Sequence, residues 1–308
     1  MIIFFSEKTL CIIIGGGYGN GSTSSTFEVL TGDLGTKQLP NLPEGTIGSS
    51  MVKYKGNIIL LFGGYKNSKQ CLQLDHGTWK EHSTLNEDRI MHSVVTTKHT
   101  TFIFGGFNSS RTYEYLQKES NTWLTGNNKI PGGYYSGCAI AVKSEQEIWL
   151  IGGFGIEYGT EKRILSFNIN DHTFQELPFR LNVRRVGSRC AYIPNTNKII
   201  VTGGCNLTSI QRKSTESTEI IDTDRRVSII ASPMNDKRFG HGIGIITFNG
   251  KETLAVFGGR EKSYKWLDSA ELYNTKTGKW EPTDIKLKGP KGNFGFLTMK
   301  LSEAISNF

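Results

Sequence analysis

The segment NIILLFGGYK, residues Asn57–Lys66, places a pair of glycines directly after five apolar residues, Ile58–Phe62. Alone, this pattern fits a buried strand that leads into a phosphate-binding loop, and it equally fits a strand that ends in a turn. The rest of the sequence distinguishes the two structures, because the pattern occurs six times. The other copies are CIIIGG (Cys11–Gly16), TFIFGG (Thr101–Gly106), IWLIGG (Ile148–Gly153), IIVTGG (Ile199–Gly204) and LAVFGG (Leu254–Gly259).

The copies recur at a regular distance, and other features keep the same spacing. The second glycines of successive pairs lie 48, 42, 47, 51 and 55 residues apart. A polar loop and a short strand follow each pair, and then a turn and a further strand. A bulky residue opens that further strand, at Trp79, Trp123, Phe174 and Trp280, with Leu39 and Ile229 as weaker counterparts. One more strand precedes the next glycine pair, so each unit contains four short strands and no helical period.

Four strands in about 50 residues are typical of one blade of a β-propeller. The repeat resembles that of the kelch family, which has the glycine pair, a Trp some 15 to 21 residues later and an Arg-x-x-His before the next inner strand. Arg89–His92 and Arg238–His241 carry the last element, and Arg185–Ser188 keeps only its Arg. The resemblance extends from Met1 to about Leu301. It implies an all-β fold, a six-bladed kelch-type propeller with four antiparallel strands per blade.

The whole chain, 1–308, is then one domain. Its blades are expected at about 1–45, 46–87, 88–130, 131–180, 181–234 and 235–285, with a ring-closing strand and tail over 286–308. Both GNFGFLTMKL (Gly292–Leu301) and MIIFF at the start could supply the innermost strand of the first blade, and we expect the C-terminal segment to do so.

The glycines and tryptophans of the repeat are predicted to be structural. Gly provides positive φ and close backbone approach, and Trp fills the space between two blades. These residues are Gly63, Gly64, Gly105, Gly106, Gly152, Gly153, Gly203, Gly204, Gly258, Gly259, Trp79, Trp123 and Trp280. Glutamates at one position of four third strands, Glu28, Glu114, Glu219 and Glu271, are also expected to share a structural role, because a catalytic acid is needed only once.

No catalytic pattern is found in the sequence. GGGYGNG (Gly15–Gly21) is followed by a polar loop and a strand, whereas a phosphate site needs a helix. The six histidines are scattered, and no G-x-S-x-G motif occurs. Some kelch-type propellers are enzymes, notably copper oxidases and sialic-acid epimerases, but their residue sets cannot be assembled here. We therefore expect no enzyme activity, no cofactor and no metal.

The five cysteines, Cys11, Cys71, Cys138, Cys190 and Cys205, contain no C-x-x-C pair. We expect all five to be reduced, which favours a cytoplasmic or otherwise intracellular location. No run of 18 apolar residues is present, so no membrane partner is expected. The apolar start is split at Ser6–Lys8 into runs too short for a signal peptide.

The charge balance predicts a protein partner. Net charge is +8 with pI about 9.1, and in a propeller many of the basic residues fall on loops that open at one face, interleaved with aromatic residues. Arg pairs bidentately with carboxylates, and many kelch propellers bind acidic segments on this face. The predicted partner-binding residues are Tyr65, Lys66, Arg89, Arg111, Tyr134, Tyr135, Arg184, Arg185, Arg238, Arg260 and Tyr264.

Alternatives to this interpretation remain open. Arg89, Arg185 and Arg238 could instead be repeat residues that hold their own loops. The central pocket could serve a sugar-binding or enzymatic propeller. Family resemblance also allows a ubiquitin-ligase substrate receptor or an actin-binding subunit that acts through another module. Nucleic acid is disfavoured, because no RNA or DNA module is visible and the basic residues form no continuous stripe.

Overall fold

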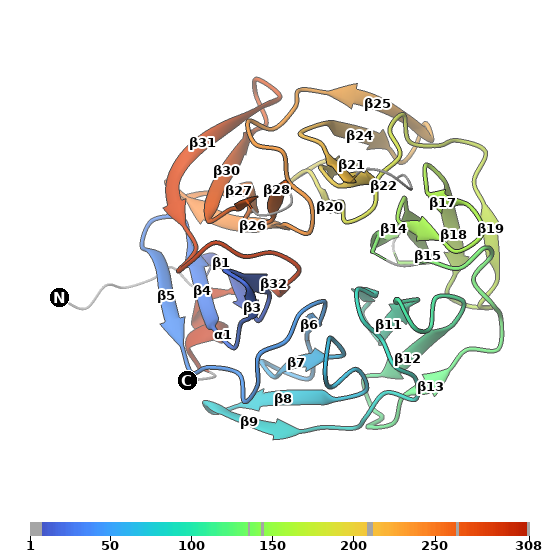
Figure 1. Cartoon of the computed structure of the whole chain (residues 1–308), viewed down its shortest axis with the longest axis horizontal. Helices are drawn as coiled ribbons and strands as arrows, with labels where there is room; N and C mark the ends of the chain where they lie inside the picture. Colours follow the sequence, from blue (N-terminus) through green and yellow to red (C-terminus); the bar gives the residue numbers. More distant parts are fainter. Residues whose placement is uncertain (1–7, 135, 143–144, 208–211, 263–264, 307–308) are drawn as a thin grey trace.

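Six four-stranded antiparallel sheets surround a central axis in the computed structural model of the chain (Figure 1). The structure describes residues 8–134, 136–142, 145–207, 212–262 and 265–306. The predicted fold class is confirmed: an all-β, six-bladed propeller with four antiparallel strands in every blade.

In each blade the strands follow one another from the innermost, next to the axis, to the outermost. Blade 1 contains β32 (Gly295–Lys300), β1 (Leu10–Gly15), β4 (Phe27–Thr31) and β5 (Gly35–Leu39). Blade 2 contains β6 (Ser50–Lys53), β7 (Ile59–Phe62), β8 (Cys71–Asp75) and β9 (Thr78–Glu81). Blade 3 contains β10 (Ser93–Thr96), β11 (Thr100–Phe104), β12 (Tyr113–Gln117) and β13 (Leu124–Thr125). Blade 4 contains β14 (Cys138–Val142), β15 (Glu147–Ile151), β18 (Ile164–Asn168) and β19 (Phe174–Glu176). Blade 5 contains β20 (Arg189–Tyr192), β21 (Lys198–Thr202), β24 (Thr218–Asp222) and β25 (Val227–Ala231). Blade 6 contains β26 (Gly242–Phe248), β27 (Lys251–Phe257), β30 (Ser269–Asn274) and β31 (Lys279–Lys286).

Four small hairpins extend from the loops that follow the glycine pairs. They are β2 (Tyr18–Gly19) with β3 (Ser22–Thr23), β16 (Phe154–Gly155) with β17 (Gly159–Thr160), β22 (Cys205–Leu207) with β23 (Arg212–Ser214), and β28 (Arg260–Lys262) with β29 (Lys265–Trp266). The GGGYGNG segment thus enters a hairpin and not a helix. A short helix, α1 (Leu301–Ile305), follows β32, and no helix among the described residues is long and apolar enough to span a bilayer.

The hydrophobic core is divided into clusters that lie between adjoining blades. Trp79 of blade 2 packs edge-on against Phe27 of blade 1, with ring centroids 5.1 Å apart. Trp123 of blade 3 likewise packs on Phe62 of blade 2 at 5.6 Å. Trp280 joins a cluster that contains Ile200 of blade 5. The predicted role of the tryptophans between blades is therefore confirmed.

The prediction that Ile229 takes the place of Trp in blade 5 is wrong. Trp280 pairs in register with Tyr273, two residues after Glu271, whereas the residue opposite the equivalent Ile221 is Ser228. Ile229 is one position further along, so its side chain lies on the other side of the strand and is 58% exposed.

Positive φ is confirmed for the glycine pairs of the last five copies, whereas in the first copy Gly16 and Gly17 have positive φ and Gly15 is still part of β1. Gly63 and Gly64 have φ of 65° and 101°, and a Cβ on Gly63 would lie 2.6 Å from the carbonyl oxygen of Arg89. The Gly64 N–H donates to that same oxygen at 2.9 Å. The pair therefore ends the second strand where the loop leading into the next blade comes closest, and no side chain fits between them.

The C-terminal segment closes the ring, as expected. In Figure 1 the strand β32 lies beside β1 in blade 1. Their antiparallel register pairs Ile12 with Thr298 and Gly15 with Gly295. The MIIFF segment lies outside the described residues.

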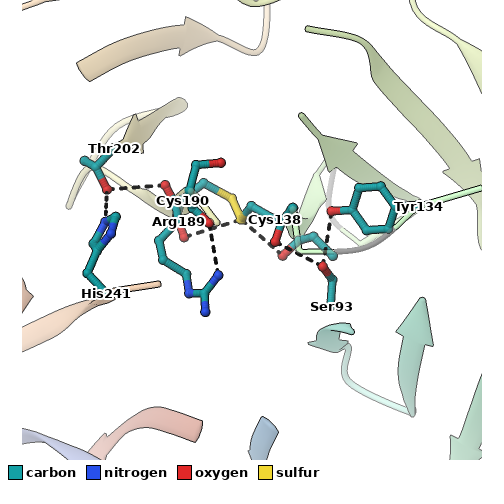
Figure 2. The surroundings of a disulfide bond; sticks show 10 residues. Ser93, Tyr134, Cys138, Arg189, Cys190, Thr202 and His241 are labelled. Atoms are coloured by element: carbon teal, nitrogen blue, oxygen red, sulfur yellow. Dashed lines mark hydrogen bonds between the residues drawn. A yellow bond between two sulfur atoms is a disulfide. The ribbon is translucent and has the colours of Figure 1, made fainter. Parts of the chain in front are cut away.

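The expectation that all five cysteines are reduced is wrong. Cys138 and Cys190 form a disulfide with a Cα–Cα distance of 5.9 Å, which links the innermost strands β14 and β20 of two neighbouring blades (Figure 2). Because the two residues are 52 positions apart, only the ring geometry brings them together. Cys11, Cys71 and Cys205 are buried thiols, and burial raises the pKa of Cys11 and Cys71 to about 12.

Candidate functional site

One end of the propeller, called the loop face here, carries the segments after the glycine pairs and the segments that lead into the innermost strands. Around the axis at this end, six residues form a closed backbone ring. Each N–H donates to the carbonyl oxygen of the equivalent residue in the preceding blade, at 2.5 to 2.8 Å. The ring residues, all with positive φ, are Gly48, Met91, Ser136, Gly187, Gly240 and Asn293. This ring fixes the six loops relative to one another.

Two residues before the ring position, Arg89 is completely buried beside Glu114 of the same blade. Its Nε donates to Glu114 Oε1 at 2.8 Å, and its Nη1 donates to the Gly105 carbonyl oxygen at 2.7 Å. The Glu114 carboxylate also accepts the backbone N–H groups of Asn86 and Glu87. The pair therefore holds the connection from the preceding blade in place.

The same arrangement recurs in two further blades. Arg185 pairs with Glu219 at 2.9 Å and Arg238 with Glu271 at 3.1 Å, all four buried. In blade 1 a buried lysine, Lys291, replaces the arginine and pairs with Glu28. The structural role predicted for the glutamates is confirmed.

Direct partner contact by Arg89, Arg185 and Arg238 is contradicted by this burial. Each guanidinium is neutralised inside the fold by a glutamate and by backbone carbonyls. The alternative, that these arginines hold their own loops, is what the structure shows. Arg is exposed in most proteins, so its residue type alone points to the surface.

Tyr134 is also buried, so its predicted partner contact is wrong. It occupies the arginine position of its blade, where it packs in a cluster with Leu165, and burial raises the pKa of its hydroxyl. Leu165 stands where other blades have Glu. In blade 2 the equivalent pair is Thr46 and Leu72. Where the cation is missing, the carboxylate is missing too.

The remaining predicted residues with described positions do lie on the loop face. Tyr65 and Lys66 are exposed, and Lys66 pairs with Glu44 at 2.9 Å. Arg111, half-exposed, pairs with Glu157 on the loop of the next blade. Arg184 is exposed, and its Nη1 donates to the Thr160 carbonyl oxygen at 2.8 Å. Tyr135 and Tyr264 lie outside the described residues.

Arg260 is partly covered by aromatic rings. Its guanidinium lies 4.6 Å from the ring centroid of Phe239 and 5.1 Å from that of Trp266, and Tyr18 packs on Trp266 in turn at 5.4 Å. Neighbouring hairpins also touch, β17 with β22 and β23 with β28. Blades 4, 5, 6 and 1 thus carry a continuous arc of hairpins, called the hairpin arc here, while blades 2 and 3 have short loops (Figure 1).

Four large apolar side chains are exposed on the loops of blades 2, 3 and 4, and two of them, Ile156 and Tyr158, lie in the turn of the blade 4 hairpin at one end of the hairpin arc. Their exposed fractions are 55% for Tyr65, 62% for Phe107, 59% for Ile156 and 55% for Tyr158. Backbone hydrogen bonds from Tyr65 to Ile47 and from Phe107 to Ile90 fix two of these loops against the segments that lead to the ring. We call these four residues the apolar arc. Its signal in the sequence is a large residue on the loop after a glycine pair.

The histidines of the repeat are unsuited to acid–base work at neutral pH. Burial, with a contribution from the Arg89 cation, lowers the pKa of His92 to about 3. Burial and nearby arginines also lower the pKa of His241, whose Nε2 lies 2.8 Å from Thr202 Oγ1. Among the described residues, no three His, Cys, Asp or Glu side chains are grouped so that they could hold a metal ion.

No protein-family model matches the chain, and no curated protein has significant sequence similarity to it. Function must therefore be argued from the chemistry of its own surfaces, since one fold supports many activities.

Proposed function

We propose that this chain is a non-catalytic, kelch-type protein-binding propeller that holds a polar or acidic segment of a partner on its loop face. The observation that carries the proposal is the apolar arc of Tyr65, Phe107, Ile156 and Tyr158. Clustered exposed apolar side chains, rimmed by polar groups, mark interaction sites, and rigid aromatic residues dominate binding energy in such sites.

Charge around the apolar arc favours an acidic segment. Exposed Lys66, Lys69, Arg111 and Arg184 outnumber the exposed carboxylates Glu44, Asp88 and Glu157, so this set carries a net charge of +1. Surface ion pairs are worth only about 0–1 kcal/mol, so a partner carboxylate can displace Glu44 or Glu157 at little cost.

The cysteines do not indicate the cellular compartment in which this binding takes place. The Cys138–Cys190 disulfide removes the argument that reduced thiols favour an intracellular site, because disulfides persist mainly in oxidising compartments. A ubiquitin-ligase or actin-related role would require another module, and no contact among the described residues favours it.

Affinity capture with quantitative mass spectrometry tests the proposal. Arg111→Glu with Arg184→Glu is expected to lose the partners that the wild type captures, and so is Phe107→Ser with Tyr65→Ser. The matched control is Lys251→Glu with Lys276→Glu, which makes the same charge change at the opposite end of the propeller. Equal capture by all variants, with unchanged melting temperatures, would disprove a loop-face site.

A further inference from the structure

The propeller encloses a central cavity of about 940 Å³. The cavity extends from the ring residues Gly48, Met91, Ser136 and Asn293 to turns at the opposite end, which include Lys55 and Lys118. Its walls come from the innermost strands β6, β10, β14, β20 and β32. Pockets of about 300–1,000 Å³ are typical of small-molecule sites.

The first residue of each innermost strand forms a layer just below the backbone ring. Five of the six are small: Ser50, Ser93, Cys138, Gly242 and Gly295. The sixth is Arg189, the first residue of β20. One long cation among five small residues gives this layer both room and a single charged group.

Arg189 points toward the middle of the ring of blades, beside the disulfide (Figure 2). Its Nη1 donates to the Ser188 carbonyl oxygen at 3.1 Å, and its guanidinium lies 5.8 Å from the ring centroid of Phe296. Within the described part of the chain, no carboxylate lies within ion-pair distance of it. Arg89, Arg185 and Arg238 each have a glutamate, so Arg189 differs from the other interior arginines.

The residues that line the cavity include more cations than carboxylates. Removal from water lowers the pKa of Arg189 to about 10, and the Tyr134 hydroxyl only partly offsets this. Burial lowers the pKa of His241, and the cations of Arg189, Arg238 and Arg185 lower it further. At the far end of the cavity Lys55 and Lys118 accompany Glu119, and Lys53 is paired with Glu303 at 2.7 Å.

We propose that the central cavity binds a small-molecule oxyanion, a carboxylate or a phosphate, whose oxygens pair with the guanidinium of Arg189. A guanidinium has five N–H donors in a planar fork that matches two oxygens of such a group. The backbone ring encircles the axis at the loop face, so the anion enters from the opposite end, past Lys55 and Lys118. This site is separate from the loop face and does not depend on the proposed partner.

Isothermal titration calorimetry on the full chain tests the site, with citrate and inorganic phosphate as probes at constant ionic strength. At least one probe is expected to bind at one site with a Kd of about 1 mM or tighter. Arg189→Met, which keeps the apolar stem over Phe296, is expected to weaken that binding at least about tenfold. The matched control is Arg225→Met, in the exposed turn between β24 and β25, which should bind like the wild type. The preferred probe distinguishes a carboxylate from a phosphate ligand.

Two results would overturn the proposal. One is the absence of binding by either probe, and the other is equal binding by wild type and Arg189→Met. If Arg189→Met fails to fold, Arg189→Lys replaces it, because it keeps the charge but loses the fork. Binding by Arg189→Lys should weaken at least about threefold, and wild-type affinity in that variant would also count against the site.

Discussion

Glu271 accepts hydrogen bonds from four donors that a neutral side chain could not satisfy together. They are the backbone N–H of Asn235 at 2.7 Å, its side-chain Nδ2 at 2.8 Å, the N–H of Asp236 at 3.1 Å and Arg238 Nε at 3.1 Å. Glu271 itself is buried out of contact with water. Buried charges stabilise a fold only as a complete set, because either partner alone retains its desolvation penalty.

Breaking this pair from one side should therefore be costly. We expect Arg238→Met and Glu271→Leu each to lower the free energy of unfolding by about 3–5 kcal/mol. The double variant has uncharged side chains at both positions, as blade 4 has with Tyr134 and Leu165. Its loss of unfolding free energy should therefore be smaller than the sum of the two single losses by at least about 1 kcal/mol. Urea unfolding of the four proteins measures the coupling, and strict additivity would contradict the ion-pair account.

His92 makes the free energy of unfolding depend on pH, and a substitution separates its contribution from that of the carboxylates. Its pKa is about 3 in the folded state and about 6.5 when unfolded, so the unfolded chain binds more protons between these values. The contribution is complete above about pH 6.5 and is lost as pH falls, by up to about 1.4 kcal/mol per unit. His92→Leu should flatten the decline between about pH 6.5 and 4.5, whereas His99→Leu, at an exposed site, should not. Parallel slopes for His92→Leu and wild type would show that His92 does not cause the decline.

For single residues, the sequence shows which positions are equivalent between repeats, but it does not show whether their side chains are buried or exposed. The repeated glutamates indicated a structural role, but Arg89, Arg185 and Arg238 were placed on a surface. The sequence does contain evidence for burial of these arginines, because the two blades that lack the cation, at Thr46 and Tyr134, also lack the carboxylate. Only an alignment in strand register reveals that pairing.

The second strand of each blade ends at a glycine pair, and the backbone segment that leads into the next blade lies in contact with these glycines. Gly105 and Gly56 have nearly the same φ, 63° and 61°, but different surroundings. A Cβ on Gly105 would lie 1.8 Å from the Tyr134 carbonyl oxygen, whereas a Cβ on Gly56 meets nothing within 4 Å.

Alanine substitutions at Gly56 and Gly105 separate the energetic cost of positive φ from the cost of a steric clash with neighbouring backbone. Gly56→Ala should cost only the left-handed backbone penalty, about 1–2 kcal/mol. Gly105→Ala should cost at least about 3 kcal/mol, since backbone must also move. Thermal and urea unfolding compare the two variants. Equal losses would show that positive φ alone explains the glycine pairs.

Elements were predictable because their spacing repeats six times, and two register errors, at Leu39 and Ile229, mark the limit. Leu30 is equivalent to Tyr273, and the residue opposite it is Thr36 and not Leu39. Strand order follows from the repeats, whereas either terminus of the chain fits the ring-closing position in the sequence, and the structure assigns it to Gly295–Lys300. Ile229 was misassigned because apolarity does not show which face of a strand a residue occupies when neighbours on both sides are apolar. Of the apolar arc, only Tyr65 is among the predicted partner-binding residues, since exposure depends on which loops are short.

At the scale of the whole molecule, two different links hold the ring together. Blade 1 is closed by pairing of β1 with β32, from opposite ends of the chain, and blades 4 and 5 are joined by the Cys138–Cys190 disulfide. Sequence could not show the second link, because repeats 52 residues apart become neighbours only once the ring forms.

The disulfide should contribute to global stability because it restricts the unfolded chain over a 52-residue separation. We expect Cys138→Ser with Cys190→Ser to lower the free energy of unfolding by about 2–4 kcal/mol. A phosphine reductant should destabilise the wild type similarly and leave the double variant unchanged, which makes that variant its own control. Alkylation of the unreduced, denatured wild type should label three thiols, those of Cys11, Cys71 and Cys205. Labelling of all five would show that the bond does not form, and the ring would then be held by its noncovalent contacts alone.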